Sequence, residues 1–180
     1  MGVLQGRFEV VVVELTTLPV AGLVIDRLVI RAEDVRIQPG LPARLKASAL
    51  GVKAVVAQAD VDRWTKHTHL PFRLALTEKG VMMSAGMGGI KVGEMLTTIE
   101  VEGSLMTLRP VRAAMFGRQA PLVNLLRGFL PLPPLPAGVH LARVEHSEGE
   151  VAAYFDLGVL DEPLTPNLAR RLRKRLLLRG

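Results

Sequence analysis

The feature that most constrains how this chain folds is a succession of short alternating segments between residues 72 and 113. Apolar residues there alternate with polar or small ones, which is the two-residue period of a β-strand whose faces meet different surroundings. Glu78-Lys79-Gly80, Gly88-Gly89 and Gly103 separate the segments and are typical of tight turns. Such short connections predict antiparallel hairpins, because parallel strands require long crossovers.

Comparable signals extend this pattern toward both ends of the chain. Strands are predicted over residues 7–15, 23–37, 43–56, 72–77, 81–87, 90–102, 104–113, 138–146 and 150–157. Helices are predicted over residues 58–67, 119–130 and 166–180. Val92-Gly93-Glu94 predicts a β-bulge within its strand. We therefore predict an α+β fold, with one domain over residues 1–165 and a basic amphipathic C-terminal helix after it.

The composition indicates an aliphatic protein with an excess of apolar side chains. Hydrophobic residues make up 49% of the 180, whereas aromatic residues make up only 4%. The core must therefore consist largely of aliphatic side chains and methionine. This excess predicts a lipid-facing surface or an internal cavity. No apolar run reaches the roughly 18 residues that a membrane span needs.

The first residues of the sequence do not resemble an export signal. Their apolar run, Val10–Val13, is short, is bracketed by Glu9 and Glu14, and follows no positively charged leader. We therefore expect a cytoplasmic protein if Met1 is the true start, or an exported one if a leader was removed before this numbering begins.

Residues that carry out catalysis or bind metals are sparse. The chain has no cysteine, which excludes disulfides, thiolate ligands and cysteine nucleophiles. The four histidines, His67, His69, His140 and His146, match no metal-site spacing. The carboxylates are scattered, and no hydrolase, metalloprotease or phosphate-loop motif is present. We therefore expect no enzyme, no metal and no cofactor.

The C-terminal segment has the clearest electrostatic signal. The formal charge is +6, and six of the 23 basic residues fall within residues 170–179. Leu168, Leu172 and Leu176 recur every four residues between them, as in a basic amphipathic helix that lies on an anionic membrane. Alternatively, the leucines dock on the domain and leave a solvated basic face. Few aromatics and no basic stripe elsewhere disfavour nucleic acid as the partner.

Two further stretches are consistent with an apolar binding surface. Met82, Met83, Met87, Met95 and Met106 fall in consecutive predicted strands, where methionine serves either an adaptable binding surface or a gap-filled core. Between residues 130 and 138, four prolines stand among leucines. That segment is predicted to be a stiff crossover against the core or the rim of an apolar cavity.

These stretches resemble the actinobacterial LmeA-like phospholipid-binding family. The resemblance rests on LLRGFLPLPPLPAGVHLARVEHSEGEVAAYFDLGVLDEPL, on GRFEVVVVEL followed by GLVIDRLVIRAEDVRI, and on VVAQADVDRW. It covers most of residues 6–162. It implies a strongly curved antiparallel sheet wrapped around one or two helices, similar to the tubular lipid-binding (BPI-like) proteins. It also implies phospholipid binding in the cell envelope without catalysis. The missing export signal and the arginine-rich tail depart from the family pattern.

The resulting hypothesis is a lipid-binding or lipid-transfer protein whose acyl chains lie between the concave sheet face and the helix over 119–130. The predicted apolar lining is Met83, Met87, Leu122, Leu126, Phe129, Leu130, Leu132, Leu135, Val139 and Phe155. The predicted headgroup or membrane contacts are Arg127, Arg170, Arg171, Arg173, Lys174 and Arg175. The alternative is an interaction protein with a closed core, whose basic helix binds an anionic membrane, an acidic protein or nucleic acid.

Overall fold

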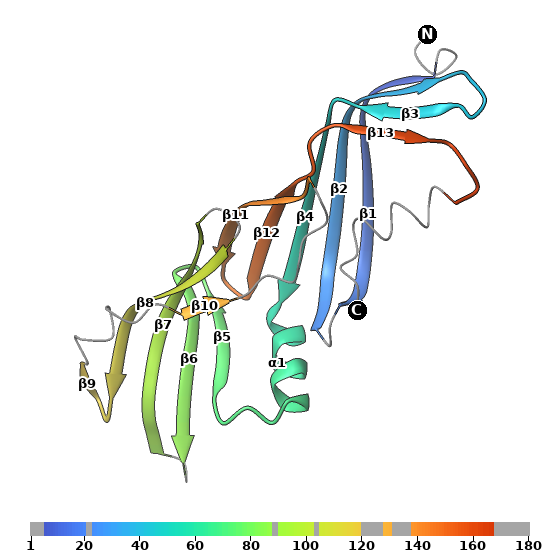
Figure 1. Ribbon diagram of the computed structural model, residues 1–180. Coiled ribbons are helices and arrows are strands. Elements are labelled where there is room, and N and C mark those ends of the chain that lie inside the picture. The colour runs from blue at the N-terminus through green and yellow to red at the C-terminus, as the bar shows by residue number, and fades with distance from the viewer. Residues whose placement is uncertain are drawn as a thin grey trace.

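The computed structural model describes residues 6–20, 23–87, 90–102, 105–119, 128–130 and 138–167. These residues contain thirteen strands and one helix, arranged as two antiparallel sheets (Figure 1). The elements are β1 (Arg7–Val20), β2 (Leu23–Gln38), β3 (Arg44–Ala47), β4 (Ala49–Ala57), α1 (Gln58–His67), β5 (Arg73–Thr77), β6 (Gly80–Met87), β7 (Ile90–Glu102), β8 (Leu105–Met115), β9 (Arg118–Gln119), β10 (Gly128–Leu130), β11 (His140–Ser147), β12 (Glu150–Asp156) and β13 (Leu160–Pro163). The predicted α+β class with predominant antiparallel sheet is confirmed.

Seven strands form the first sheet, called here the large sheet, in the order β11-β12-β4-β2-β3-β13 with β1 on the free side of β2. The long strand β2 pairs with β4 through Arg27–Glu33 and with β3 through Arg36–Gln38. Between these two pairings, Ser48 donates hydrogen bonds from its backbone N–H and its hydroxyl to the carbonyl oxygen of Glu33, at 2.9 and 3.1 Å. The sheet bends here, so that β3 and β13 run at a steep angle to β4 and β12 (Figure 1).

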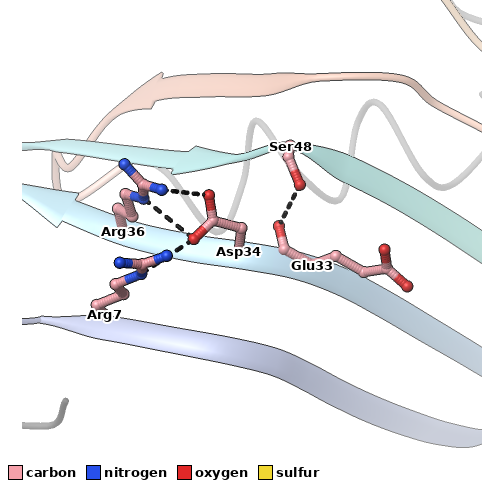
Figure 2. A network of polar contacts seen from close by, with 5 residues as sticks. All are labelled: Arg7, Glu33, Asp34, Arg36 and Ser48. Atoms are coloured by element: carbon pink, nitrogen blue, oxygen red, sulfur yellow. Dashed lines mark hydrogen bonds and ion pairs between the residues drawn. The ribbon is translucent and has the colours of Figure 1, made fainter.

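Asp34 lies at this bend in a left-handed conformation, with φ of 47°. Its carboxylate accepts hydrogen bonds from Arg36 at 2.6 Å and from Arg7 of β1 at 3.2 Å (Figure 2). These bonds, that from Arg36 foremost, hold the pKa of Asp34 below its usual range. The side chains are exposed, so we assign the network a role in fixing local geometry rather than a large share of stability.

Six strands form the second, small sheet, in the order β10-β8-β7-β6-β5 with β9 on β8. The predicted bulge in β7 is confirmed: Ala85 pairs with Gly93 and Gly86 pairs with Lys91, which leaves Val92 as the extra residue. Extra residues of this kind bend a strand and increase its twist.

The only helix among the described residues, α1, coincides with the prediction over residues 58–67. Asp60 in its first turn and Lys66 and His67 in its last turn suit the helix dipole. The helix packs against β2, β4 and β5, and its residue Val61 is buried, as is Val55 of β4. α1 therefore sits where the chain passes from the large sheet to the small one.

The two sheets meet along a seam formed by β11, β5 and β7. Gly149, in the turn between β11 and β12, donates its N–H to the carbonyl of Leu76 at 3.0 Å and accepts from the N–H of Gln58 at 2.8 Å. The side-chain amide of Gln58 donates to the carbonyl of Leu74 at 2.8 Å and accepts from the N–H of Leu76 at 2.6 Å. Gln58 thus satisfies the edge of β5 as a neighbouring strand would.

One helix prediction was wrong in extent. Gln119 belongs to β9, and Gly128–Leu130 form β10 paired with β8, so no helix spans residues 119–130. The spacing of apolar residues in this segment fits one face of a helix. Backbone groups can equally hydrogen-bond to the free edge of a sheet, and the periodicity within the segment does not show that such an edge is available. Residues 120–127 lie outside the described residues.

Other boundaries also differ from the predictions. The strand expected over residues 43–56 is divided at Ser48 into β3 and β4, and the short strands β9, β10 and β13 were not predicted. The helix predicted over 166–180 lies outside the described residues except for Pro166 and Asn167, which form a turn.

Candidate functional site

One face of the large sheet is lined with aliphatic and aromatic side chains, and we call it the apolar face. Directly paired residues of antiparallel strands project to the same side. The register joins Ile30 to Val13 and Val52, and joins Val52 to Phe155. An adjacent row contains Leu15, Leu28, Ala54 and Ala153. The face therefore crosses four strands: β1, β2, β4 and β12.

Two buried clusters make this face continuous along the strands. One surrounds Leu28, Val52 and Ala54, and the other surrounds Val35, Ala47, Leu50 and Leu160. Ile30 and Leu157 pack against both clusters and so join them.

Exposure along the apolar face rises toward β1. Leu28 on β2 is 4% exposed, whereas Leu15 and Val13 on β1 are 40% and 44% exposed. The most accessible part of the apolar face is therefore its β1 margin.

The opposite face of the large sheet carries most of its charged side chains, together with aliphatic residues such as Val12 and Val55. Tyr154 lies between its register partners Arg143 and Lys53, with the Arg143 guanidinium 3.8 Å from the ring centroid. The Tyr154 hydroxyl donates to Glu145 at 2.5 Å, and Arg143 donates to the same carboxylate at 2.8 Å. These two bonds lower the pKa of Glu145. This polar cluster thus lies on the face opposite Phe155 and Val52.

The small sheet also presents a row of apolar residues. Met83 pairs with Leu74 on one side and with Met95 on the other, and Met95 pairs with Ala113. Met82 projects to the other side of β6, where it pairs with Leu96. The predicted juxtaposition of methionine-bearing strands is therefore confirmed for β6, β7 and β8, with Met83 and Met95 as direct cross-strand neighbours.

Among the described titratable groups at the seam, His146 is the one whose pKa is lowered by burial. Its register partner Val151 pairs in turn with Val56, so the imidazole is on the apolar side of the large sheet. Nε2 accepts a hydrogen bond from the N–H of Ile99 in β7 at 3.4 Å. Nδ1 is buried and has no hydrogen-bond partner in the described part of the chain. Burial lowers the pKa of this histidine, because an imidazolium would be poorly solvated there.

Three of the residues predicted to contact lipid have described side chains. Phe155 lies on the apolar face beside Val52, and Met83 lies in the methionine row of the small sheet. Val139 is half-buried just before β11. These positions place Phe155 and Met83 on different sheets.

The remaining predicted site residues are not described in this detail. Met87 is in β6 and Phe129 and Leu130 are in β10, but their side chains lie outside the described part. The others lie wholly outside it: Leu122, Leu126, Leu132, Leu135, Arg127, Arg170, Arg171, Arg173, Lys174 and Arg175.

The sequence-based interpretation missed most of the apolar face. Val13, Leu15, Leu28, Ile30 and Val52 were not among the predicted lining residues, although they form its centre and its exposed margin. The signal was the apolar alternation of the first two strands. Its importance becomes clear only when the register places β1, β2, β4 and β12 side by side.

The described residues contain neither a cluster of metal ligands nor a membrane-spanning helix. Among them, no group of three or more histidine, aspartate or glutamate side chains could hold a metal ion. No helix in the described ranges is long and apolar enough to cross a membrane.

Comparison with known proteins assigns the chain to a family. A family model described as LmeA-like phospholipid-binding matches residues 1–155. Comparison with curated proteins and with solved structures gave no match. The match spans most of the chain, including α1 and every described strand except Asp156 at the end of β12 and the whole of β13. The chain therefore belongs to the LmeA-like phospholipid-binding family.

Proposed function

We propose that this protein binds or transfers phospholipid without catalysis and holds acyl chains against the apolar face of the large sheet. The observation that supports this most strongly is the continuity of that face, from buried Leu28 and Val52 to the exposed β1 margin at Val13 and Leu15. Removing an acyl chain from water onto such a surface is favourable by about 25 cal/mol per Å². Membership of a phospholipid-binding family supports the same ligand.

The predicted lining residues extend this proposal to the rest of the chain. Phe155 and Val139 adjoin the large sheet, and Met83 would lengthen the apolar track onto the small sheet. The leucines of the proline-rich segment would form a rim, and Arg127 with the basic residues 170–175 would meet phosphate headgroups. The predicted wall formed by a helix over 119–130 is withdrawn, since β9 and β10 occupy its ends.

The same basic residues support peripheral association with an anionic membrane. Each basic side chain near such a surface contributes about 1 kcal/mol, so a cluster of five is enough to localise a protein. This would bring the apolar face to its lipid source, and a cell-envelope location is part of the proposal.

Exposed residues on the two faces of β1 provide the test. Val13 and Leu15 belong to the apolar face, whereas the neighbouring Val12 pairs with Arg31 on the other face and is 56% exposed. We expect the double variant Val13→Asp, Leu15→Asp to lose most co-purified phospholipid, measured by mass spectrometry of organic extracts. The matched variant Val12→Asp should retain it. Equal retention in both would rule out the apolar face as the lipid site.

The competing proposal is an interaction protein with a closed core. The low exposure of Leu28 and Val52 favours it, because a fully packed interior would bury them equally well. In that case organic extracts contain no stoichiometric lipid. Binding to an anionic partner then depends only on residues 170–175.

A further inference from the structure

The turn that joins β8 to β9 exposes far more apolar surface than a tight turn normally does. Met115 pairs with Arg118 across this turn, and we call residues Met115–Arg118 the β8–β9 tip. Phe116 is 69% exposed and Met115 is 58% exposed. Figure 1 places the tip at the end of the small sheet that is remote from β3 and β13. The tip therefore projects an aromatic ring and a thioether from one extremity of the fold.

Local stability does not account for Phe116. It has φ of 49° and Gly117 has φ of 75°, the two successive positive angles of a type I′ hairpin turn. Asn-Gly is the favoured pair in such a turn, because a left-handed conformation strains a bulky residue. The tip is nevertheless held firmly, since the N–H of Phe116 donates to the carbonyl of the bulge residue Val92 at 2.9 Å. A strained, exposed phenylalanine on an anchored turn indicates a role outside the fold.

The charges on β8 and β9 are of one sign, although Glu94 of β7 lies opposite Ala114. No acidic residue occurs between Leu105 and Gln119, whereas Arg112 and Arg118 are both exposed. In the described ranges neither of these arginines forms an ion pair or a side-chain hydrogen bond. Arg109 differs, because it approaches Glu100 at 3.5 Å. An apolar tip flanked by arginines that form no ion pair among the described residues is complementary to an anionic lipid surface, whose interior accepts the aromatic ring and whose phosphates accept the guanidinium groups.

The opposite end of the molecule provides a contrast. Leu41, in the loop between β2 and β3, is fully exposed. Its basic neighbours Arg36 and Arg44 are engaged by Asp34 at 2.6 Å and by Asp161 at 2.8 Å. The basic charge around Leu41 is therefore largely compensated by carboxylates. Leu41 has no neighbouring arginines that lack an ion pair in the described ranges, such as those that flank the β8–β9 tip.

From these observations we infer that the β8–β9 tip inserts Phe116 and Met115 into the interfacial layer of an anionic bilayer, with Arg112 and Arg118 on lipid phosphates. This docking site consists of other residues than the apolar face and the basic C-terminal segment. It stands whether or not the apolar face holds lipid, because it concerns attachment to a bilayer and not retention of single lipid molecules.

The first test compares single substitutions in the full chain. Phe116→Asn suits the type I′ turn, so the variant should fold at least as well as the parent. Its affinity for phosphatidylglycerol-containing vesicles, measured by co-sedimentation, should fall about tenfold or more. Val159→Asn and Leu41→Asn, which remove exposed apolar side chains elsewhere, should change it less than about twofold. Arg118→Gln should lower it about fivefold on these vesicles and leave binding to pure phosphatidylcholine unchanged.

The second test reads the position of the tip directly. The chain has no cysteine, so Phe116→Cys and Val159→Cys each create a unique site for a nitrobenzoxadiazole label. On phosphatidylglycerol-containing vesicles, the label at position 116 should shift to the blue and be quenched by lipid-borne quenchers, and the label at 159 should stay water-like. The inference is overturned if the protein co-sediments while the label at 116 remains in water. It is equally overturned if Phe116→Asn binds like the parent or if Leu41→Asn is the variant that fails.

Discussion

At the scale of single residues, His146 shows how burial and a backbone hydrogen bond both favour a neutral imidazole. Burial lowers the pKa of His146, and its Nε2 can accept the N–H of Ile99 only while that nitrogen carries no proton. The unfolded chain therefore takes up a proton at a higher pH than the folded chain does. Histidine contributes stability above its ordinary pKa of about 6.5, and this contribution is lost as the pH falls below that value.

We expect the free energy of unfolding, measured with urea, to decrease between pH 7.5 and pH 5.5. His146→Leu should remove most of this decrease, because leucine has no titratable group and so takes up no proton on unfolding. His140→Leu, at an exposed position of the same strand, should leave the decrease in place. An unchanged pH dependence in His146→Leu would contradict the assignment.

At the scale of elements, the hairpin turns show that glycines of similar appearance have different roles. Gly80 begins β6 with φ of 132°, and a Cβ atom there would lie 2.4 Å from the carbonyl oxygen of Thr97. Gly149, between β11 and β12, has φ of 75° and no atom within 4 Å of such a Cβ. Close backbone approach constrains the first turn, whereas only the dihedral angle constrains the second.

Gly80→Ala should therefore destabilise the fold much more than Gly149→Ala. The second change costs about 1 kcal/mol for the left-handed conformation. The first must also displace β7 from β6, and we expect it to cost about 3 kcal/mol or more. Urea denaturation of both variants measures the difference, and similar midpoints would show that β7 yields easily to the added methyl group.

At the scale of the whole molecule, the two sheets depend on a few polar contacts at their seam. Gln58 is central to them, because its amide both donates to Leu74 and accepts from Leu76 while its backbone N–H donates to Gly149. A carboxylate at this position could still accept from Leu76 but would place an oxygen against the carbonyl of Leu74. The seam thus requires a side chain that is donor and acceptor at once.

Gln58→Glu should destabilise the protein by about 1–3 kcal/mol at pH 7 and speed amide hydrogen exchange at Leu76 and Gly149. Gln58→Ala should speed amide exchange in the same way. It places no oxygen against the carbonyl of Leu74, so this variant should lose less stability than Gln58→Glu. If the amides of Leu76 and Gly149 exchange only through global unfolding in both variants, contacts other than those of Gln58 hold the seam together.

Part of this architecture could be predicted from the sequence, because it depends on local periodicity. The alternation after residue 72, the turns at Gly80 and Gly149, the bulge at Val92 and the helix over 58–67 are all properties of short segments. The resemblance of longer segments was enough to identify the LmeA-like phospholipid-binding family. Such features need no knowledge of which strands become neighbours.

The tertiary structure alone decided the features that depend on pairing between distant segments. Gly128–Leu130 became a strand because β8 offered an edge. One apolar surface exists because the register aligns four strands, and it contains Val13, Leu28, Val52 and Phe155. Phe116 became notable only once its left-handed backbone and exposure were seen together. The pairing of β10 with β8 and the register of the four strands join residues far apart in the chain, which local periodicity does not encode.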